Sequence, residues 1–201
     1  NIVCVTNRKP VKAYEENGSF LPFLEKIKEA AKKKPAFIIL REKDLSESEY
    51  EALARDCLRI CQKHAVPLNL NSQIAVARRI GCDGIHLPFH LLLQHKNELE
   101  DFSRIGVSLH SPEEAAQLAD TPATYVQAGH VFPTDCKAGV PPRGLSFLHA
   151  VCQATDLPVF GIGGITAERY PAVLQTGAAG ACIMSGLMTC NDVAQTMQPM
   201  L

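Results

Sequence analysis

The sequence has almost no excess of charge of either sign and no long hydrophobic run. Its 20 basic and 21 acidic residues give a formal net charge of -1, so no global field draws the chain to nucleic acid or to an anionic membrane. No apolar stretch approaches the roughly 20 residues that a membrane-spanning helix needs, and residues 1–6 are strand-like. We expect a soluble protein whose partner is a small molecule, with no nucleic-acid or membrane partner.

The eight cysteines lack the dense spacing of a secreted disulfide scaffold. We therefore expect reduced thiols in a cytoplasmic protein. Cys57 and Cys61 lie four residues apart on a predicted helix, a spacing that suits a metal, but no Cys/His pair at ligand spacing lies nearby. We interpret both as buried small side chains, and the sequence predicts neither a metal site nor a cofactor.

Short β-branched runs alternate with longer segments of helical period, which is typical of a parallel sheet built from β-α units. The predicted strands cover residues 2–6, 36–41, 67–70, 84–87, 105–109, 124–128, 158–162 and 180–184. The predicted helices cover residues 22–34, 46–64, 72–80, 111–119, 146–155 and 166–176, with a less regular one within 91–102. Ser46, Ser111 and Thr166 are the predicted helix caps.

Eight β-α units in 201 residues leave about 25 residues for each unit, near the lower limit of a (β/α)8 barrel. An open doubly wound sheet is the alternative. Residues 81–84 and 177–180 both have the pattern of a short turn from a helix into a strand, in which glycine adopts a left-handed conformation. These turns favour an α/β fold with one (β/α)8 TIM-barrel domain over residues 1–201. The chemistry of such a barrel lies at the carboxyl ends of its strands.

The connection at residues 129–144 is about fifteen residues long where two to six are usual. It begins at a strand end with His130 and also carries Thr134, Asp135, Lys137 and Arg143. A mobile surface loop is the plain interpretation, and its place in the barrel favours an active-site loop. Among the seven histidines, only His110 and His130 close a predicted strand, so these two are candidates for acid-base catalysis, with His130 ranked first.

Glycines at the ends of the last two strands predict a phosphate site. Gly163 and Gly164 follow one strand, and Ser185 and Gly186 follow the other. Their backbone N–H groups can face an anion without interference from a Cβ atom, and this is the usual phosphate position in such barrels. Ordinary turns are the alternative.

Three polar residues follow earlier strands. Arg41 and Lys43 are two residues apart in an extended segment, so both can face an anionic substrate, although a solvated charge pair explains them nearly as well. Asn71 is either a ligand or the N-cap of the next helix.

The chain resembles the thiamin phosphate synthase and thiazole tautomerase (TenI) superfamily over nearly its whole length. Its most specific part is Gly-His-Val-Phe-Pro-Thr-Asp-Cys-Lys at residues 129–137. The other matching segments are residues 41–43, 84–87, 106–108 and 161–165. The resemblance implies a (β/α)8 barrel that handles a thiazole phosphate, adds Ser108, Thr134 and Lys137 to the expected substrate-binding residues, and implies a homodimer.

Synthases of this superfamily bind Mg²⁺ through an Asp in an Asn-Asp pair after strand three and a second Asp after strand four. This chain has Asn71-Ser72 at the pair and Pro-Phe-His-Leu at residues 88–91, although Mg²⁺ prefers anionic oxygen ligands. Ile39 replaces a Gln, Cys136 replaces a Thr, and His130 replaces a Pro of the synthases.

These departures favour a thiazole tautomerase, an isomerase in which His130 moves a proton without a metal. A thiamin phosphate synthase, which is a transferase, and a barrel that binds the thiazole phosphate without catalysis are the alternatives.

Overall fold

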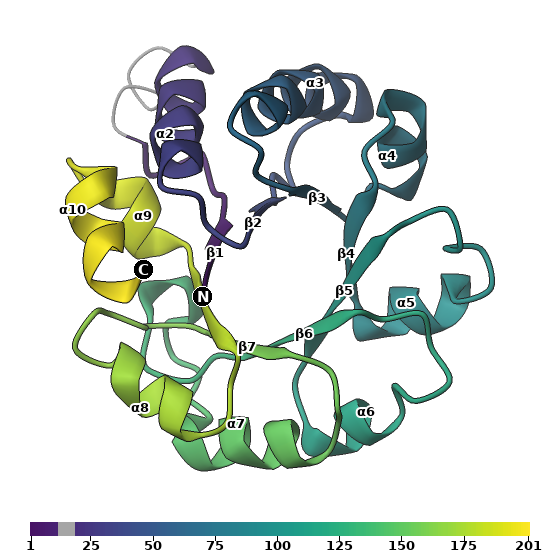
Figure 1. The fold of residues 1–201 in the computed structure, drawn as a ribbon, viewed down its shortest axis with the longest axis vertical. Helices are drawn as coiled ribbons and strands as arrows, with labels where there is room; N and C mark the ends of the chain where they lie inside the picture. Colours follow the sequence, from purple (N-terminus) through teal and green to yellow (C-terminus); the bar gives the residue numbers. More distant parts are fainter. Residues whose placement is uncertain (12–18) are drawn as a thin grey trace. The chain divides into compact units, whose positions relative to one another are not determined.

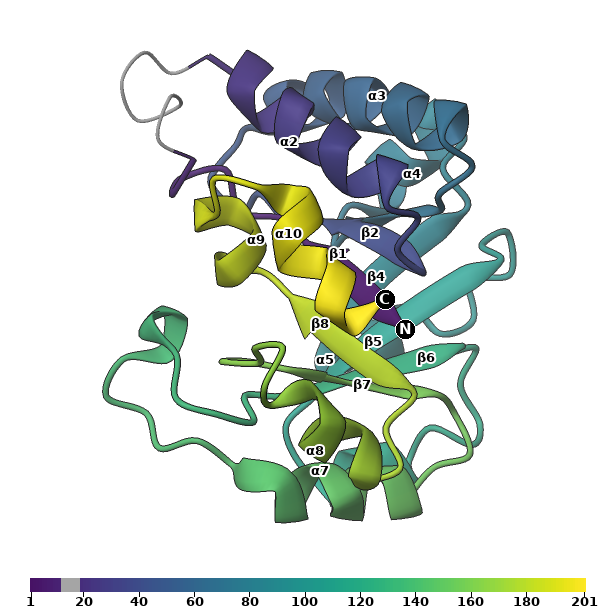
Figure 2. The ribbon, with the colours of Figure 1, turned by 60° about the vertical axis from the view of Figure 1, so that its left-hand side comes forward.

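The computed structural model describes residues 1–11 and 19–201. Within these residues, parallel strands in the order β1 to β8 form a closed barrel. Figure 1 labels β1 to β7, and Figure 2 labels β8. The strands are β1 (Ile2–Val5), β2 (Phe37–Leu40), β3 (Leu68–Asn71), β4 (Gly84–Pro88), β5 (Arg104–Leu109), β6 (Tyr125–Gly129), β7 (Val159–Ile162) and β8 (Gly180–Ile183). The predicted (β/α)8 barrel is confirmed, every strand end lies within one residue of its predicted position, and the open sheet is wrong.

Helices follow the strands along the chain. They are α2 (Leu21–Lys32), α3 (Glu47–Lys63), α4 (Ile74–Ile80), α5 (Phe89–His95), α6 (Pro112–Ala116), α7 (Gly144–Gln153), α8 (Tyr170–Gln175), α9 (Ser185–Thr189) and α10 (Val193–Met197), with 3-10 turns η1 (Asp135–Lys137) and η2 (Gln198–Met200). The irregular helix predicted within residues 91–102 begins earlier, at Phe89, and α9 and α10 were not predicted. None of the helices in the described residues has the length and hydropathy that a membrane span requires.

The chain divides into two compact units. One consists of Asn1–Gly84 with Ile183–Leu201, and the other is Ile85–Cys182. The single domain over residues 1–201 stays a prediction.

In the first unit, α3 buries one face and exposes the other. Its buried residues recur at helical spacing and include Tyr50, Cys57 and Cys61. The Tyr50 hydroxyl donates to the carbonyl of Leu40 at 2.7 Å, which joins the helix to the end of β2. Burial raises the pKa of the Cys61 thiol to about 12 and that of the Cys57 thiol well above its usual range, so both are packing residues, as predicted.

Two of the three predicted caps are confirmed. Ser46 accepts from the backbone of Glu49, which reaches back to the Ser46 N–H in a capping box. Ser111 caps α6 by accepting from the backbone of Glu114. Thr166 does not cap a helix, because α8 begins only at Tyr170 and the Thr166 hydroxyl donates to Glu168 instead.

The predicted glycine turns are also confirmed. Gly81 ends α4 in the left-handed conformation with φ of 70°, and Gly177 has φ of 92°. In the first unit, α10 lies beside α2, as Figure 2 shows.

Candidate active site

The loop between β6 and α7, whose path Figure 2 shows, is closed at its base by backbone hydrogen bonds. Arg143 N–H donates to the carbonyl of His130 at 2.9 Å, and Gly144 N–H donates to Val131 at 3.0 Å. Val131 and Phe132 continue the pairing with β7 beyond the strand end, with bonds to Ile162 and Gly163 of 2.8 and 3.0 Å. The base of the loop is therefore fixed by both strands.

His130 lies at this base and is 8% exposed. Its Nε2 is 3.2 Å from the carbonyl oxygen of Val140. A carbonyl only accepts, so Nε2 carries the proton in this contact. The ring thus links the first residues of the loop to its far side. No described residue contacts Nδ1 within hydrogen-bond distance.

Gly163 and Gly164 pack directly against the start of the same loop. Both have positive φ, 101° and 62°. A Cβ on Gly163 would come 2.4 Å from the Cβ of His130, and one on Gly164 would come 2.3 Å from the carbonyl oxygen of Pro133. Among the described residues, no acceptor faces the N–H of either glycine, which agrees with the predicted anion role without testing it.

Thr134 and Lys137 are the other two predicted binding residues of the loop, and they lie beyond its base. Thr134 is half-buried and accepts from the Lys137 N–H at 3.0 Å through its backbone, while Lys137 is exposed. The side chain of Cys136 lies outside what the structure describes. Arg169 is the N-cap of α8. Its guanidinium donates to the carbonyl of Gly164 at 2.6 Å and lies 4.9 Å from the centre of the Phe132 ring.

A chain of polar side chains on β4, β5 and β6 was missed by the sequence analysis. His86 Nδ1 lies 2.9 Å from the Tyr125 hydroxyl, and His86 Nε2 lies 2.8 Å from Ser108 Oγ. Ser108 in turn donates to Gln127 Oε1 at 3.2 Å. Two of the four, Ser108 and His86, belong to segments on which the resemblance rests. The only sequence signal for the others was a polar residue within an apolar strand pattern.

Gln127 also lies near Cys182. Burial raises the pKa of that thiol to about 12, and the Gln127 amide acts in the opposite direction. No described oxygen or nitrogen accepts from Gln127 Nε2.

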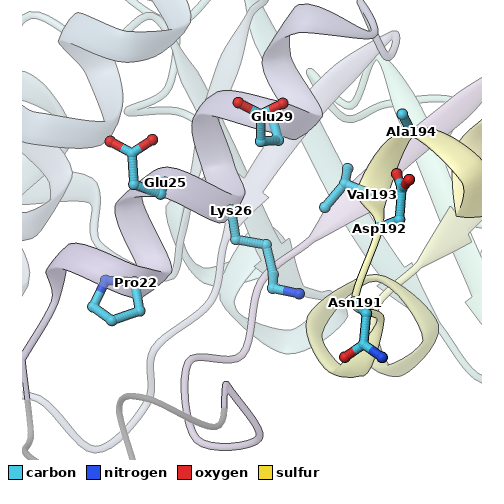
Figure 3. A pocket seen from close by; sticks show the side chains of 8 residues that line it. All are labelled: Pro22, Glu25, Lys26, Glu29, Asn191, Asp192, Val193 and Ala194. Carbon is cyan, nitrogen blue, oxygen red and sulfur yellow. The ribbon is translucent and has the colours of Figure 1, made fainter.

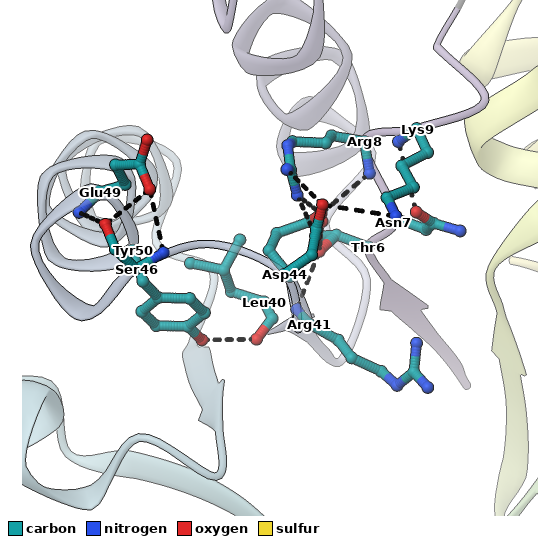
Figure 4. A network of polar contacts seen from close by, with 11 residues as sticks. Thr6, Asn7, Arg8, Lys9, Leu40, Arg41, Asp44, Ser46, Glu49 and Tyr50 are labelled. Carbon is teal, nitrogen blue, oxygen red and sulfur yellow. Dashed lines mark hydrogen bonds and ion pairs between the residues drawn. The ribbon is translucent and has the colours of Figure 1, made fainter.

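In the first unit, the segment that carries Arg41 and Lys43 is held by buried charges (Figure 4). Glu42 accepts from the Thr6 hydroxyl at 2.7 Å and from Arg8 Nη1 at 3.0 Å. Thr6 Oγ1 also accepts from the Arg41 N–H at 2.9 Å. Because Glu42 is buried, its neighbours on both sides project elsewhere: Arg41 is partly exposed and Lys43 is exposed.

Asn71 closes β3, and its amide donates to the Ser72 hydroxyl at 3.0 Å. The N-cap of α4 is Gln73, so the interpretation of Asn71 as a cap is wrong and its role as a ligand stays a prediction. Ser185 and Gly186 form the start of α9, and their pairing with Gly163 and Gly164 around a phosphate stays a prediction as well.

The donor set does not fit the Mg²⁺ that the resemblance assigns to synthases. Ser72 offers a hydroxyl, and residues 88–91 offer a histidine and no carboxylate. Within residues 1–11 and 19–201, no group of three or more His, Cys, Asp and Glu side chains is placed to hold a metal ion.

His110 is exposed, and its backbone N–H donates to Glu114 Oε2 at the start of α6. His149, on α7, packs against the chain: its Nδ1 lies 3.0 Å from the carbonyl oxygen of Thr176. A separate open cavity of about 330 Å³ lies between α2 and the start of α10 and contains none of the predicted residues (Figure 3). It is lined by Pro22, Glu25, Lys26, Glu29, Asn191, Asp192, Val193 and Ala194.

Comparison with known proteins corrects the expected reaction. The thiamine-phosphate synthase of Lysinibacillus sphaericus is 35% identical over 166 residues, which cover 79% of this chain and 77% of that protein. A probable thiamine biosynthetic bifunctional enzyme of rice is 36% identical over 153 residues, or 74% of this chain, and the match spans only 28% of that longer protein. Because the relatives are named as synthases, the assignment as a tautomerase is wrong.

A solved protein structure has a similar fold. A thiamine phosphate pyrophosphorylase from Pyrococcus furiosus superimposes over 100% of this chain and 93% of its own, with a TM-score of 0.82 and 24% identity. The family model described as thiamine monophosphate synthase matches residues 3–187. The chain therefore belongs to the TMP-TENI family, the family of thiamine monophosphate synthase.

Proposed function

We propose that this chain is a transferase of the thiamine-phosphate synthase kind, which joins a pyrimidine diphosphate to a thiazole phosphate and releases diphosphate. The observation that carries the proposal is the 35% identity to a thiamine-phosphate synthase over 77% of that enzyme. The expected binding residues supply further support, because they provide the donors that two anionic substrates require.

The phosphate of the thiazole is taken by backbone N–H groups of Gly163 and Gly164, for which no described residue provides an acceptor. Ser185 and Gly186 contribute in the same way in this proposal. Arg41, Lys43 and Lys137 offset the charge of the diphosphate, and Asn71, Ser108 and Thr134 orient the substrates by hydrogen bonds. Holding two reactants together is itself a large contribution to such a reaction.

In this function His130 holds the loop in place and does not transfer a proton. Its Nε2 is engaged by Val140, and its carbonyl by the N–H of Arg143. The ring thereby fixes the segment that carries Thr134 and Lys137.

A second candidate is a barrel that binds the thiazole phosphate without catalysis. This candidate is favoured by one observation: neither Ser72 nor residues 88–91 provide a carboxylate that could bind the metal of the synthases.

The two candidates are separated by one pair of measurements. Calorimetric titration of the protein with the thiazole phosphate alone reports binding, and mass spectrometry of mixtures with both substrates, with and without Mg²⁺, reports the joined product. Product formation supports the transferase. Binding without product supports the second candidate, and the absence of both contradicts both.

A further inference from the structure

The hydrogen-bonded chain of Tyr125, His86, Ser108 and Gln127 has a direction that follows from its donors and acceptors. Gln127 offers its oxygen, which only accepts, so Ser108 uses its single hydroxyl proton there, at 3.2 Å. Ser108 must then accept from His86, whose Nε2 lies 2.8 Å away. The imidazole therefore carries its proton on Nε2.

The other ring nitrogen completes the direction. In a neutral imidazole with a proton on Nε2, Nδ1 is an acceptor. The Tyr125 hydroxyl, at 2.9 Å, is the donor that it meets. The chain therefore runs from the tyrosine hydroxyl through the imidazole and the serine hydroxyl to the glutamine oxygen.

Packing holds this arrangement in place. His86 and Tyr125 are 1% and 3% exposed, and their ring centres are 5.6 Å apart. Gly106 leaves the room for them, because a Cβ at that position would come 2.0 Å from the Tyr125 ring and 2.5 Å from His86 Nδ1. Neither ring can turn without displacing the other. Ser108 is only partly buried and is the most accessible member of the chain.

We propose that His86 and Tyr125 are positioning residues that hold Ser108 as a hydrogen-bond acceptor toward the substrate. This inference rests on the proposed function, in which Ser108 contacts substrate. The hydroxyl oxygen has two lone pairs. His86 occupies one, and the proton is committed to Gln127, so the remaining lone pair faces the ligand.

As a consequence, Ser108 should select for a substrate group that donates a hydrogen bond to it. An N–H or O–H group at this position completes the contacts of Ser108. A substrate group that only accepts hydrogen bonds would face the free lone pair of Ser108. The serine hydroxyl could donate to that group only by rotating, and this rotation breaks its hydrogen bond to Gln127.

The direct test is the tautomer of His86, measured without substrate. Nitrogen NMR of protein labelled with ¹⁵N-histidine distinguishes a protonated from an unprotonated ring nitrogen, and the His86→Gln variant assigns the signals. We expect a neutral ring with its proton on Nε2. A proton on Nδ1, or a fully protonated ring at neutral pH, would overturn the inference, because Ser108 would then not be held as an acceptor in the way described.

The second test uses Tyr125→Phe, with Tyr170→Phe as the matched control on α8. Loss of the hydroxyl that faces Nδ1 should move the Nδ1 resonance toward that of a free acceptor and raise KM for one substrate about five- to tenfold, with kcat within about twofold. The control should change neither. An unchanged Nδ1 resonance and KM in Tyr125→Phe, or equal changes in both variants, would contradict the positioning role.

His86→Gln and His86→Leu form a further pair. Glutamine places a donor near the position of Nε2, so it should recover part of the affinity that leucine loses. Equal loss in both variants, if both fold, would contradict the role of the Nε2 proton. If the wild-type protein makes no product, the proposed function fails alone, because the tautomer is decided independently of any substrate.

Discussion

Arg8 holds Asp44 through two parallel hydrogen bonds, from Nη1 to Oδ1 and from Nη2 to Oδ2, each 2.8 Å long. Nη1 also lies 3.0 Å from Glu42 Oε2, and the side chains of Arg8 and Glu42 are 4% and 1% exposed. One guanidinium thus joins the segment after β1 to the segment that carries Arg41 and Lys43. Planar, bidentate pairing of this kind is available to arginine and not to lysine.

Replacement of Arg8 by methionine should destabilise the protein strongly. It leaves the buried Glu42 carboxylate without its cation, and breaking a buried pair in this way costs about 3–5 kcal/mol. Arg59→Met is the matched control, because the pair of Arg59 and Asp56 lies on the exposed face of α3 and contributes about 1 kcal/mol or less. Urea denaturation measures both. Equal losses in the two variants would contradict the account of the buried pair.

Asp44 should make stability depend on acidity. The hydrogen bonds from Arg8 lower the pKa of its carboxyl from 3.8 to about 2. Because the folded-state pKa lies below the unfolded value, the stabilisation is complete above about pH 4 and is lost as the pH falls toward 2. Its size is modest, since the side chain is 42% exposed and salt screens it.

The measurement is urea denaturation of the wild type and of Asp44→Asn between pH 5 and pH 2.5. We expect the variant to lose less stability over this range than the wild type does, with a smaller difference at high salt. Parallel pH profiles would show that Asp44 has no such role.

Gly163 and Gly186, which are both expected to bind the phosphate, differ sharply in the space that they leave for the Cβ atom of an alanine. At Gly163, alanine would have a strained φ of 101° and a Cβ 2.4 Å from that of His130, whereas at Gly186 the nearest atom is 3.8 Å away. Gly163→Ala should therefore lower stability by about 1–3 kcal/mol, and Gly186→Ala should change it by less than about 0.5 kcal/mol. Thermal unfolding of the pair tests this, and similar melting temperatures would refute it.

His130 should prove to be a residue of loop structure. His130→Ala removes the contact with Val140 and should speed proteolytic cleavage between residues 134 and 142 severalfold, because a loop with fewer contacts opens more often. His110→Ala is the control, since His110 is exposed and contacts Glu114 only through its backbone. Cleavage at equal rates in His130→Ala and the wild type would contradict this role.

The fold could be predicted from the sequence because the alternation of β-branched and helical segments is a local property. Ser46 and Gly81 behave as their residue types require, since caps and left-handed turns depend on neighbours in the chain. Thr166 failed as a cap because Glu168 captures its hydroxyl. The helices α9 and α10 are each one short turn with no long periodic pattern.

The site was predictable only in part. Strand ends are visible in a sequence, so the positions of His130 after β6 and of Gly163 after β7 could be predicted. The partners of His86 lie 22 and 39 residues away, and no local pattern reveals which polar residues inside different strands meet. The same holds for Arg8, whose role follows from Glu42 and Asp44 on another strand connection. The reaction was predicted wrongly: the missing carboxylates at Ser72 and residues 88–91 favoured an isomerase, whereas the relatives are named as synthases.

The most direct test of the proposed transferase is a single-turnover experiment with protein in excess over both substrates. Mass spectrometry follows the joined product while a coupled assay follows diphosphate. If the chain is this transferase, the two products appear together in a one-to-one ratio, and faster than without protein. Thiazole phosphate that binds but remains unjoined, with no diphosphate released, would contradict it.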